Sequence, residues 1–291
     1  MSFPFPEQDE PVIVQGITGR FGRLHSGLMK GFGTRVAAGV TPGRGGQSVD
    51  DVPVYETVKE AVDKTNARAS VVFVPAPGFL GAAEEAVAAG IRLLVIITEH
   101  VPLRDTLKVI QLCKESGARA IGPNSPGIIM PPRRLRLGIM PAPSFRAGDV
   151  ALFSRSGSLM YEVADALSRS SIGQQIAMGV GGDPLNCTTL NECLDWAAEA
   201  EGVKSVVVVG EIGGDAEERL AAHILETGFS KPVVAYIAGR SAPREKHMGH
   251  AGAIIYGDYG TAQSKVDALR GAKVTVATTT EEIPLLVRSA T

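Results

Sequence analysis

Short apolar segments, each followed by a glycine-rich turn and a helix-like stretch, recur along most of this 291-residue chain. Continuous apolar runs of four to eight residues, bounded by glycine or proline, are typical of strands buried on both faces of a parallel sheet. In the first half we expect such strands at Val12–Gly16, Thr34–Val40, Ser70–Val74, Leu93–Thr98 and Ala118–Ile121. The intervening segments Val58–Lys64, Ala82–Ala89 and Arg104–Ser116 have helical composition and spacing, and a further helix is expected from about Leu24.

A second series of the same kind starts near Val150. We expect its strands at Val150–Phe153, Gln175–Met178, Ser205–Val209, Val233–Ile237 and Val274–Val276. We expect its helices at Ser158–Ser170, Thr188–Glu199, Asp215–Thr227 and Thr261–Arg270. This alternation predicts two doubly wound α/β domains with right-handed crossovers. The proline- and arginine-rich stretch between the series suggests a linker at 131–148, between domains at 1–130 and 149–291.

Charge, hydropathy and cysteine usage exclude several classes of protein. The formal net charge is −2, which argues against a protein that neutralises nucleic-acid phosphates. No apolar run approaches the roughly 18 residues of a membrane span. The three cysteines form no C-x-x-C pair, so neither a zinc site nor a redox pair is indicated. We expect no metal site, reduced thiols, and a protein of the cytoplasm or of an organelle matrix.

The first glycine-rich turn follows the first expected strand and reads Gly16-Ile17-Thr18-Gly19-Arg20-Phe21-Gly22. Such a strand-to-helix turn lets backbone N–H groups and the helix N-terminus approach a phosphate. Its G-x-x-G-x-x-G spacing differs from the G-x-G-x-x-G of dinucleotide folds. A tight turn without any ligand is the alternative interpretation.

The end of the second strand carries a cation where NAD-binding proteins have an acid. NAD sites usually place a carboxylate there for the ribose hydroxyls, whereas this chain has Arg44 among glycines. A lone cation suits a ribose phosphate, as in NADP or in the 3′-phosphate of coenzyme A (CoA). The loops at Pro75 and at Ile97-Thr98-Glu99 follow later strands at the same sheet edge. The sequence therefore favours an adenine-bearing ligand other than NAD.

In the second half, Ser154-Arg155-Ser156-Gly157-Ser158 lies between a strand and a helix. Hydroxyls and free amides at a helix N-terminus form an anion site, and phosphate is the obvious anion. Simple N-capping by a serine is the alternative.

His250 is flanked by glycine and alanine, which leave an imidazole accessible. A neutral imidazole can accept and release a phosphoryl group near pH 7. Glu211 ends an apolar strand, and a carboxylate bound to one ring nitrogen leaves the other nitrogen nucleophilic. The alternatives are a surface-loop histidine, a metal pair with His247, and a Glu211 that only stabilises a helix dipole. His25, His100 and His223 are interpreted as structural.

These motifs, taken in order, resemble the succinyl-CoA synthetase α-subunit family. The shared motifs begin with Gln15–Gly19, Gly39–Gly46, Val74–Pro77, Ile97–Glu99 and Gly122–Gly127, and continue with Ser154–Leu159, Gly181–Pro184, Gly210–Gly214 and Gly249–Ala253. The match runs in register from about Val12 to Ala262.

The resemblance implies a Rossmann-like CoA-binding domain followed by a flavodoxin-like domain, and phosphoryl transfer through His250 oriented by Glu211. The residues implied to contact CoA are Thr18, Gly19, Arg20, Phe21, Arg44, Pro75, Ile97, Thr98 and Glu99. Ser156, Gly157 and Ser158 would hold the phosphate, and Asn124, Ser125 and Tyr161 would lie near the acid substrate. ATP or GTP, with Mg²⁺, would bind an ATP-grasp β subunit, in an αβ or α2β2 assembly.

Several residues depart from the family pattern. Arg44 replaces a usual lysine, Ser125 a usual cysteine or threonine, and His100 a usual glycine near the expected thioester site. Glu245 and Tyr256 lie in altered stretches on either side of His250. The resemblance makes succinate the first choice of acid, and malate or another dicarboxylate, which would also fit the change at His100, is the alternative. A non-catalytic CoA-binding protein and an NADP-dependent dehydrogenase are the rival classes.

Overall fold

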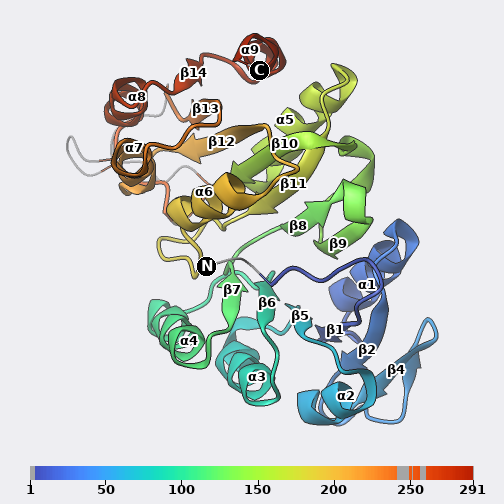
Figure 1. Ribbon diagram of the computed structural model, residues 1–291. Helices are drawn as coiled ribbons and strands as arrows, with labels where there is room; N and C mark the ends of the chain where they lie inside the picture. The colour runs from blue at the N-terminus through green and yellow to red at the C-terminus, as the bar shows by residue number, and fades with distance from the viewer. Residues whose placement is uncertain (1–3, 241–248, 251, 256–259, 291) are drawn as a thin grey trace.

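Two mostly parallel sheets, one in each half of the chain, organise the computed structural model (Figure 1). The structure describes residues 4–240, 249–250, 252–255 and 260–290. The strands of the first sheet are β1 (Val12–Gln15), β2 (Val36–Val40), β3 (Ser48–Val49), β4 (Val52–Tyr55), β5 (Ala69–Val72), β6 (Leu93–Ile96) and β7 (Arg119–Ile121). Its helices are α1 (Arg20–Phe32), α2 (Val58–Thr65), α3 (Ala76–Ala88) and α4 (Leu103–Ser116).

The first sheet has the order β3-β4-β2-β1-β5-β6-β7, and every pairing except that of β3 with β4 is parallel. Without β3 this is the Rossmann order 3-2-1-4-5-6, which reverses direction between β1 and β5. Both faces are buried, because Val12 and Val14 belong to the same apolar cluster as Met29 of α1, whereas Ile13 packs on the other face with Phe79 of α3. The predicted Rossmann-like domain is confirmed.

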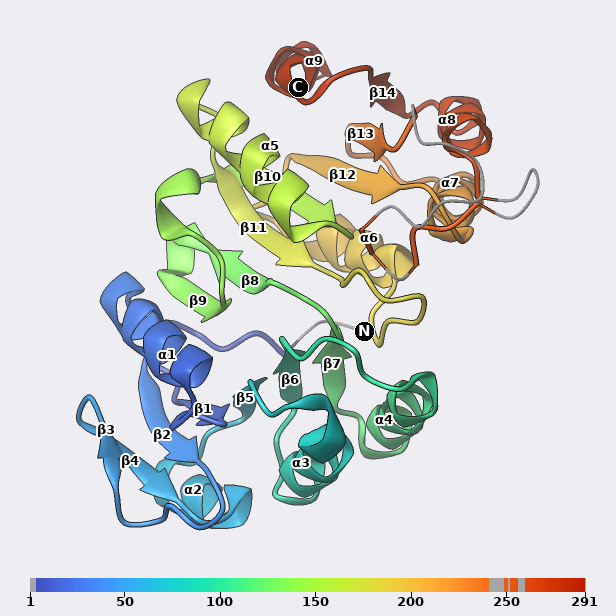
Figure 2. The ribbon, with the colours of Figure 1, turned by 180° about the vertical axis from the view of Figure 1, so that it is seen from behind.

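The second sheet is built from β8 (Gly127–Met130), β9 (Leu135–Gly138), β10 (Ala147–Ser154), β11 (Gln174–Gly179), β12 (Ser205–Glu211), β13 (Val233–Ala238) and β14 (Thr275–Ala277). Its helices are α5 (Gly157–Arg169), α6 (Leu190–Glu199), α7 (Ala216–Thr227), α8 (Ala262–Gly271) and α9 (Ile283–Ala290). The parallel strands follow the order β11-β10-β12-β13-β14, the flavodoxin order 2-1-3-4-5, as predicted. Figures 1 and 2 show α6 and α7 on one face of this sheet and α5 on the other.

The segment expected to be a linker, 131–148, differs from that expectation. It contains β9 and the start of β10, and the antiparallel hairpin β8–β9 pairs with β11 in the second sheet. Two of the prolines that suggested a linker lie in a short 3₁₀ turn, Pro131–Arg133, between the hairpin strands. Proline in that turn removes no ladder hydrogen bond, so the apolar residues on both sides remain free to pair.

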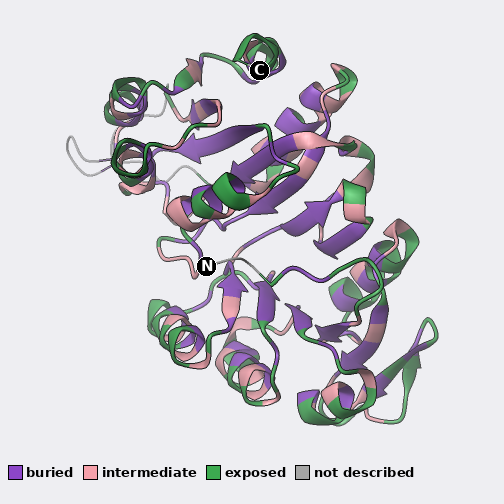
Figure 3. Ribbon diagram, viewed as in Figure 1, coloured by how far each residue is buried: buried purple, intermediate pink, exposed green. Residues whose placement is uncertain are grey.

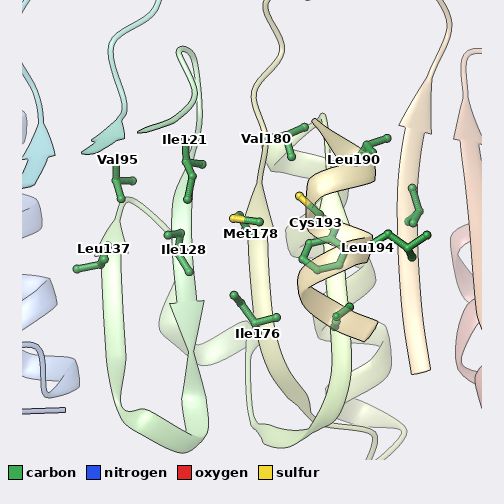
Figure 4. Close-up of a cluster of buried hydrophobic side chains, with 14 of the residues drawn as sticks. Val95, Ile121, Ile128, Leu137, Ile176, Met178, Val180, Leu190, Cys193 and Leu194 are labelled. Atoms are coloured by element: carbon green, nitrogen blue, oxygen red, sulfur yellow. The ribbon is translucent and has the colours of Figure 1, made fainter. Parts of the chain in front are cut away.

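One apolar cluster continues from the first sheet into the second. It joins Val95 and Ile121 of the first sheet with Ile128 and Leu137 of the hairpin and Met178 of β11 (Figure 4). The strands of both sheets are accordingly buried along most of their length (Figure 3). The two halves therefore share one apolar core. This core fixes the position of the carboxyl strand ends of one sheet relative to those of the other.

A buried threonine also joins the two halves. The Thr34 hydroxyl donates to the Arg136 carbonyl oxygen at 2.8 Å and accepts from the Arg136 N–H at 2.8 Å. We expect Thr34→Val to lower the free energy of unfolding by about 1–3 kcal/mol for each of the two backbone groups left unsatisfied. Thr34→Ser keeps the hydroxyl and should cost about 1 kcal/mol, the value of one methyl group. Urea denaturation of both variants tests this, and equal midpoints would contradict it.

Candidate functional site

The carboxyl ends of strands from both sheets border one cavity of about 670 Å³. In open α/β sheets, ligands bind beside the carboxyl ends where the strand order reverses. In the first sheet that point lies between β1 and β5, and in the second between β10 and β12. Most of the residues lining the cavity follow β5, β6, β7 and β10. Phe21 and His25 of α1, Ile139 after β9 and His250 from a later loop complete the lining.

Phe21 is the one member of the predicted glycine-rich motif that lines this cavity, and its side chain is 67% exposed. Thr18, Gly19 and Arg20 belong to the same turn but do not line it. The Thr18 hydroxyl donates to the Thr41 hydroxyl at 3.2 Å, which ties this turn to the end of β2. Gly19 caps α1 without a side-chain hydrogen bond, so the cap residue leaves the first amides of the helix available to a ligand.

Arg44 lies in an exposed loop after β2 and likewise does not line the cavity. The Glu56 carboxylate accepts hydrogen bonds from the N–H groups of Gly43 and Gly45, each at 2.6 Å. These bonds hold the loop on both sides of Arg44. Its guanidinium is therefore presented from a constrained backbone at the same sheet edge as the Gly16–Gly22 turn.

The remaining residues predicted to contact CoA lie together on the cavity wall. Pro75 is the N-cap residue of α3, and Ile97, Thr98 and Glu99 follow β6. The Thr98 hydroxyl donates to the Val74 carbonyl oxygen at 2.7 Å, which joins the two loops. His100 also lines the cavity, and its Nε2 lies 3.8 Å from the Glu99 carboxylate.

The residues predicted to lie near an acid substrate, Asn124, Ser125 and Tyr161, all line the cavity. The Asn124 amide donates to the Asp183 carboxylate at 3.0 Å, and the Ser125 hydroxyl donates to the Gly179 carbonyl oxygen. Burial raises the pKa of Tyr161 to about 12, so its phenol is a neutral hydrogen-bond donor at physiological pH.

The predicted phosphate-binding serines form the start of α5. Ser156 caps the helix by accepting from the Leu159 N–H at 3.4 Å, and its hydroxyl lies 3.4 Å from that of Ser158. Gly157 and Ser158 line the large cavity, whereas Ser156 and Ser158 line a second cavity of about 290 Å³. His250 lines both cavities, and Glu211 lines the smaller one. Both residues therefore lie close to the start of α5.

His250 and Glu211 contact each other directly. The Nδ1 atom of His250 lies 2.8 Å from Oε2 of Glu211, whose side chain is 8% exposed. A carboxylate can only accept a hydrogen bond, so Nδ1 carries the proton and Nε2 is left as the free ring nitrogen. The hydrogen bond to Glu211 raises the pKa of His250 above 6.5, while burial opposes that rise.

The loop carrying His250 approaches a glycine after β11. A Cβ atom on Gly182 would lie 2.7 Å from Cγ of the His250 ring. Only glycine leaves room for the ring in this position, so the Gly181-Gly182-Asp183 turn is part of the site.

Arg155 and Asp183 have no role predicted from the sequence, although both lie in motifs shared with the family. Arg155 is buried and lies 3.6 Å from the Glu211 carboxylate. Burial raises the pKa of Asp183, and the hydrogen bond from Asn124 opposes that rise. A carboxylate at the carboxyl end of β11 was the signal that could have identified Asp183.

His25, expected to be structural, also lines the cavity. Its ring stacks between Phe21 and Phe73, with centroid distances of 6.4 Å and 5.9 Å. Nη2 of the buried Arg136 lies 3.4 Å from Nδ1 of His25. Burial and the nearby Arg136 charge lower the pKa of His25, which favours the neutral ring.

His247, Glu245 and Tyr256 lie outside the described residues. Among the residues that the structure describes, no group of three or more His, Cys, Asp or Glu could hold a metal ion. No helix in the described ranges is long and apolar enough to cross a membrane.

Solved structures show the same fold. ATP citrate lyase from Methanothrix soehngenii, in complex with citrate and coenzyme A, matches 98% of this chain with a TM-score of 0.87 at 24% identity. The dinucleotide-forming acetyl-coenzyme A synthetase 1 of Ca. Korarchaeum cryptofilum matches 94% with a TM-score of 0.75 at 20% identity. The chain spans 50% and 59% of those longer chains.

Sequence comparison gives the family. The CoA binding domain family matches residues 7–100, and the CoA-ligase family matches residues 153–275. Subunit alpha 2 of an ADP-forming succinate–CoA ligase from Archaeoglobus fulgidus is 50% identical over 95% of both chains. The corresponding subunit of Aquifex aeolicus is 46% identical over 91% of this chain and 87% of its own. The chain therefore belongs to the succinate–CoA ligase α-subunit family.

Proposed function

We propose that this chain is the CoA-binding, phosphoryl-carrying subunit of an acid–CoA ligase that converts succinate, CoA and ATP into succinyl-CoA, ADP and phosphate. The observation that carries the proposal is the His250–Glu211 contact at the edge of a large cavity. The relatives named as ADP-forming succinate–CoA ligases support the choice of succinate and ATP. GTP, malate or another dicarboxylate are the alternatives that the experiment below separates.

The reaction divides into three displacements. First, the lone pair of His250 Nε2 attacks the γ-phosphorus, and the bond to the nucleoside diphosphate breaks. Second, a substrate carboxylate oxygen attacks the phosphorus, and the imidazole leaves to give an acyl phosphate. Third, the CoA sulfur attacks the acyl carbon, inorganic phosphate leaves, and the thiol proton passes to the medium.

The surrounding residues have distinct tasks in these steps. Glu211 accepts a hydrogen bond from Nδ1–H and stabilises the positive charge that the ring acquires on attack. The hydroxyls and free amides at the start of α5 would bind phosphate oxygens, since helix N-termini favour anions. Asn124, Ser125 and Tyr161 would orient the acid, and Phe21, Pro75 and Ile97–Glu99 would border CoA. Thr18–Arg20 and Arg44 would bind its phosphates outside the cavity.

The same proposal requires a second chain. The relatives reported above are named as alpha subunits, and we propose a β subunit whose ATP-grasp domain binds the nucleotide and Mg²⁺. An αβ or α2β2 assembly would bring that site to His250. Three free cysteines, Cys113, Cys187 and Cys193, support a reducing compartment such as the cytoplasm.

Intact mass after incubation with the β subunit, Mg²⁺ and ATP or GTP tests the proposal. We expect one acid-labile phosphate on this chain, discharged by succinate plus CoA. Discharge by malate but not by succinate would change the proposed substrate to malate and leave the proposed mechanism unchanged. A verified complex that takes no phosphate from either nucleotide would refute the proposed function.

The rate of phosphorylation should depend on pH through His250. A protonated Nε2 has no lone pair, so the rate should fall as the pH drops below the raised pKa of His250. Because the hydrogen bond with Glu211 is the main cause of that rise, Glu211→Gln should move the midpoint of the profile to lower pH. Single-turnover rates between about pH 5 and 9 measure both profiles. An unshifted midpoint would show that another group sets it.

A further inference from the structure

A fully buried ion pair lies next to the carboxyl end of β12, where Glu211 is the last residue. Lys265 of α8 and Glu217 of α7 are both 0% exposed, and the Lys265 ammonium donates to Oε2 of Glu217. The same ammonium donates to the Gly214 carbonyl oxygen and to Glu218, each at 3.1 Å. The pair therefore bridges both helices and the turn that follows β12.

The second oxygen of Glu217 reaches the backbone of Glu211 itself. Its Oε1 atom accepts from the Glu211 N–H at 3.1 Å. β10 pairs with β12 only as far as Ser154 opposite Val209, whereas Ile212 N–H still bonds to β13 through Ala238. Successive N–H groups of a strand point to opposite sides, so the Glu211 N–H faces the side where β10 has ended. Glu217 supplies the acceptor that a neighbouring strand would otherwise give.

The Glu211 side chain is weakly held apart from its contact with His250. Its Oε1 atom is buried without a hydrogen-bond partner among the described residues. Nη2 of Arg155 lies 3.6 Å from this oxygen, and Arg155 also donates to the Gly213 carbonyl oxygen at 3.1 Å. The direction of the Glu211 carboxylate therefore depends largely on where its backbone is fixed.

A carboxylate is the one side-chain group that suits position 217. It must accept from an N–H on one oxygen and from an ammonium on the other. An amide could satisfy only one of these, because its NH₂ group would face a donor. The Glu217 carboxylate also packs closely against the backbone of β12, since a Cβ atom on Gly210 would lie 2.5 Å from Glu217 Oε1. Buried ion pairs are often replaceable by apolar residues without loss of stability, so stability alone does not account for this pair.

We propose that Glu217 and Lys265 are positioning residues, which fix the Glu211 backbone and thereby hold its carboxylate against His250 Nδ1. Their role in catalysis rests on the proposed function, whereas their effect on His250 can be measured in the chain alone. Among the described residues, the charged groups that act on His250 are Glu211, Arg155 and Asp183, and the experiment below alters none of them.

The test compares Glu217→Gln with the double variant Glu217→Gln/Lys265→Met. In the single variant, an amide faces the Lys265 ammonium and cannot serve both donors. In the double variant the ammonium is gone, so the amide oxygen can accept from the Glu211 N–H again. We expect the pKa of His250, followed by NMR titration, to fall in the single variant and to return towards the wild-type value in the double. Phosphorylation should be about tenfold slower in the single variant, as for one misplaced hydrogen bond of roughly 1.4 kcal/mol, and recover in the double.

Glu192→Gln is the matched control. Glu192 is also a helix carboxylate with an ion pair, to Arg119 at 2.6 Å, and it accepts from the Thr189 N–H. Its loss should lower stability and leave the His250 titration unchanged. A folded Glu217→Gln chain in which His250 titrates as in wild type would overturn the inference. Absence of phosphate on the wild-type chain would refute the proposed function instead, while the titration would still decide the positioning role.

Discussion

Replacing His250 with asparagine should abolish phosphorylation of this chain and reduce thioester formation by about three orders of magnitude or more. Asparagine is close to histidine in size, and its amide NH₂ can still donate to Glu211. It has no nitrogen lone pair that can attack phosphorus. Only the covalent step is removed, so the result isolates the role of Nε2 as nucleophile.

Measurements of CoA binding and of unfolding, together with a control variant, make this result specific to His250. The variant should bind CoA and unfold as wild type does, because a half-buried loop side chain contributes little to the core. His223→Asn is the matched control, since His223 bonds to Asp195 at 2.6 Å and does not line the large cavity. That control should accept phosphate at the wild-type rate. Acid-labile phosphate retained by His250→Asn would mean that a different residue carries it.

The alternation of strands and helices could be read from the sequence because each buried strand is a continuous apolar run. Elements that break this rule were missed or shortened. α1 begins at Arg20 rather than near Leu24, because the glycine-rich turn itself forms the first helical turn. α3 begins at Ala76 and includes a proline in its first turn, where no N–H is needed. The hairpin β8–β9 was hidden by prolines that occupy only its turn.

The candidate site was predictable where a motif directly follows a strand. Ile97–Glu99, Asn124 and Gly157–Ser158 line one cavity, as carboxyl strand ends of adjoining sheets should. The contacts that depend on residues distant in sequence could not be predicted. The stacking of His25 between Phe21 and Phe73 and the contact of Arg155 with Glu211 arise only when β5 and β12 are in place. The roles assigned from the sequence to Ile97–Glu99, Asn124 and Gly157–Ser158 stay predictions until variants are measured.

Replacing Gly22 with alanine should weaken CoA binding by about tenfold or more, a loss of roughly 1.4 kcal/mol of binding free energy or greater. A Cβ atom at this position would lie 2.2 Å from the Gly16 carbonyl oxygen and 2.9 Å from Cα of Ile17. Both are backbone atoms beside the buried end of β1, so α1 itself must move away from the strand. The free amides of the α1 N-terminus and the ring of Phe21 would move with it. Forcing this separation should also lower the free energy of unfolding by about 1–3 kcal/mol.

Gly27→Ala provides a control within the same helix. Nothing lies within 4 Å of a Cβ atom at Gly27, so the added methyl group should stabilise the chain by about 0.5–1 kcal/mol through its better helix propensity. CoA affinity, measured by calorimetry, should then equal that of wild type. The two variants make the same chemical change five residues apart and differ only in what the new methyl group meets. If both bind CoA equally well, the close approach of α1 to β1 serves packing alone, and the phosphates of CoA must be held elsewhere.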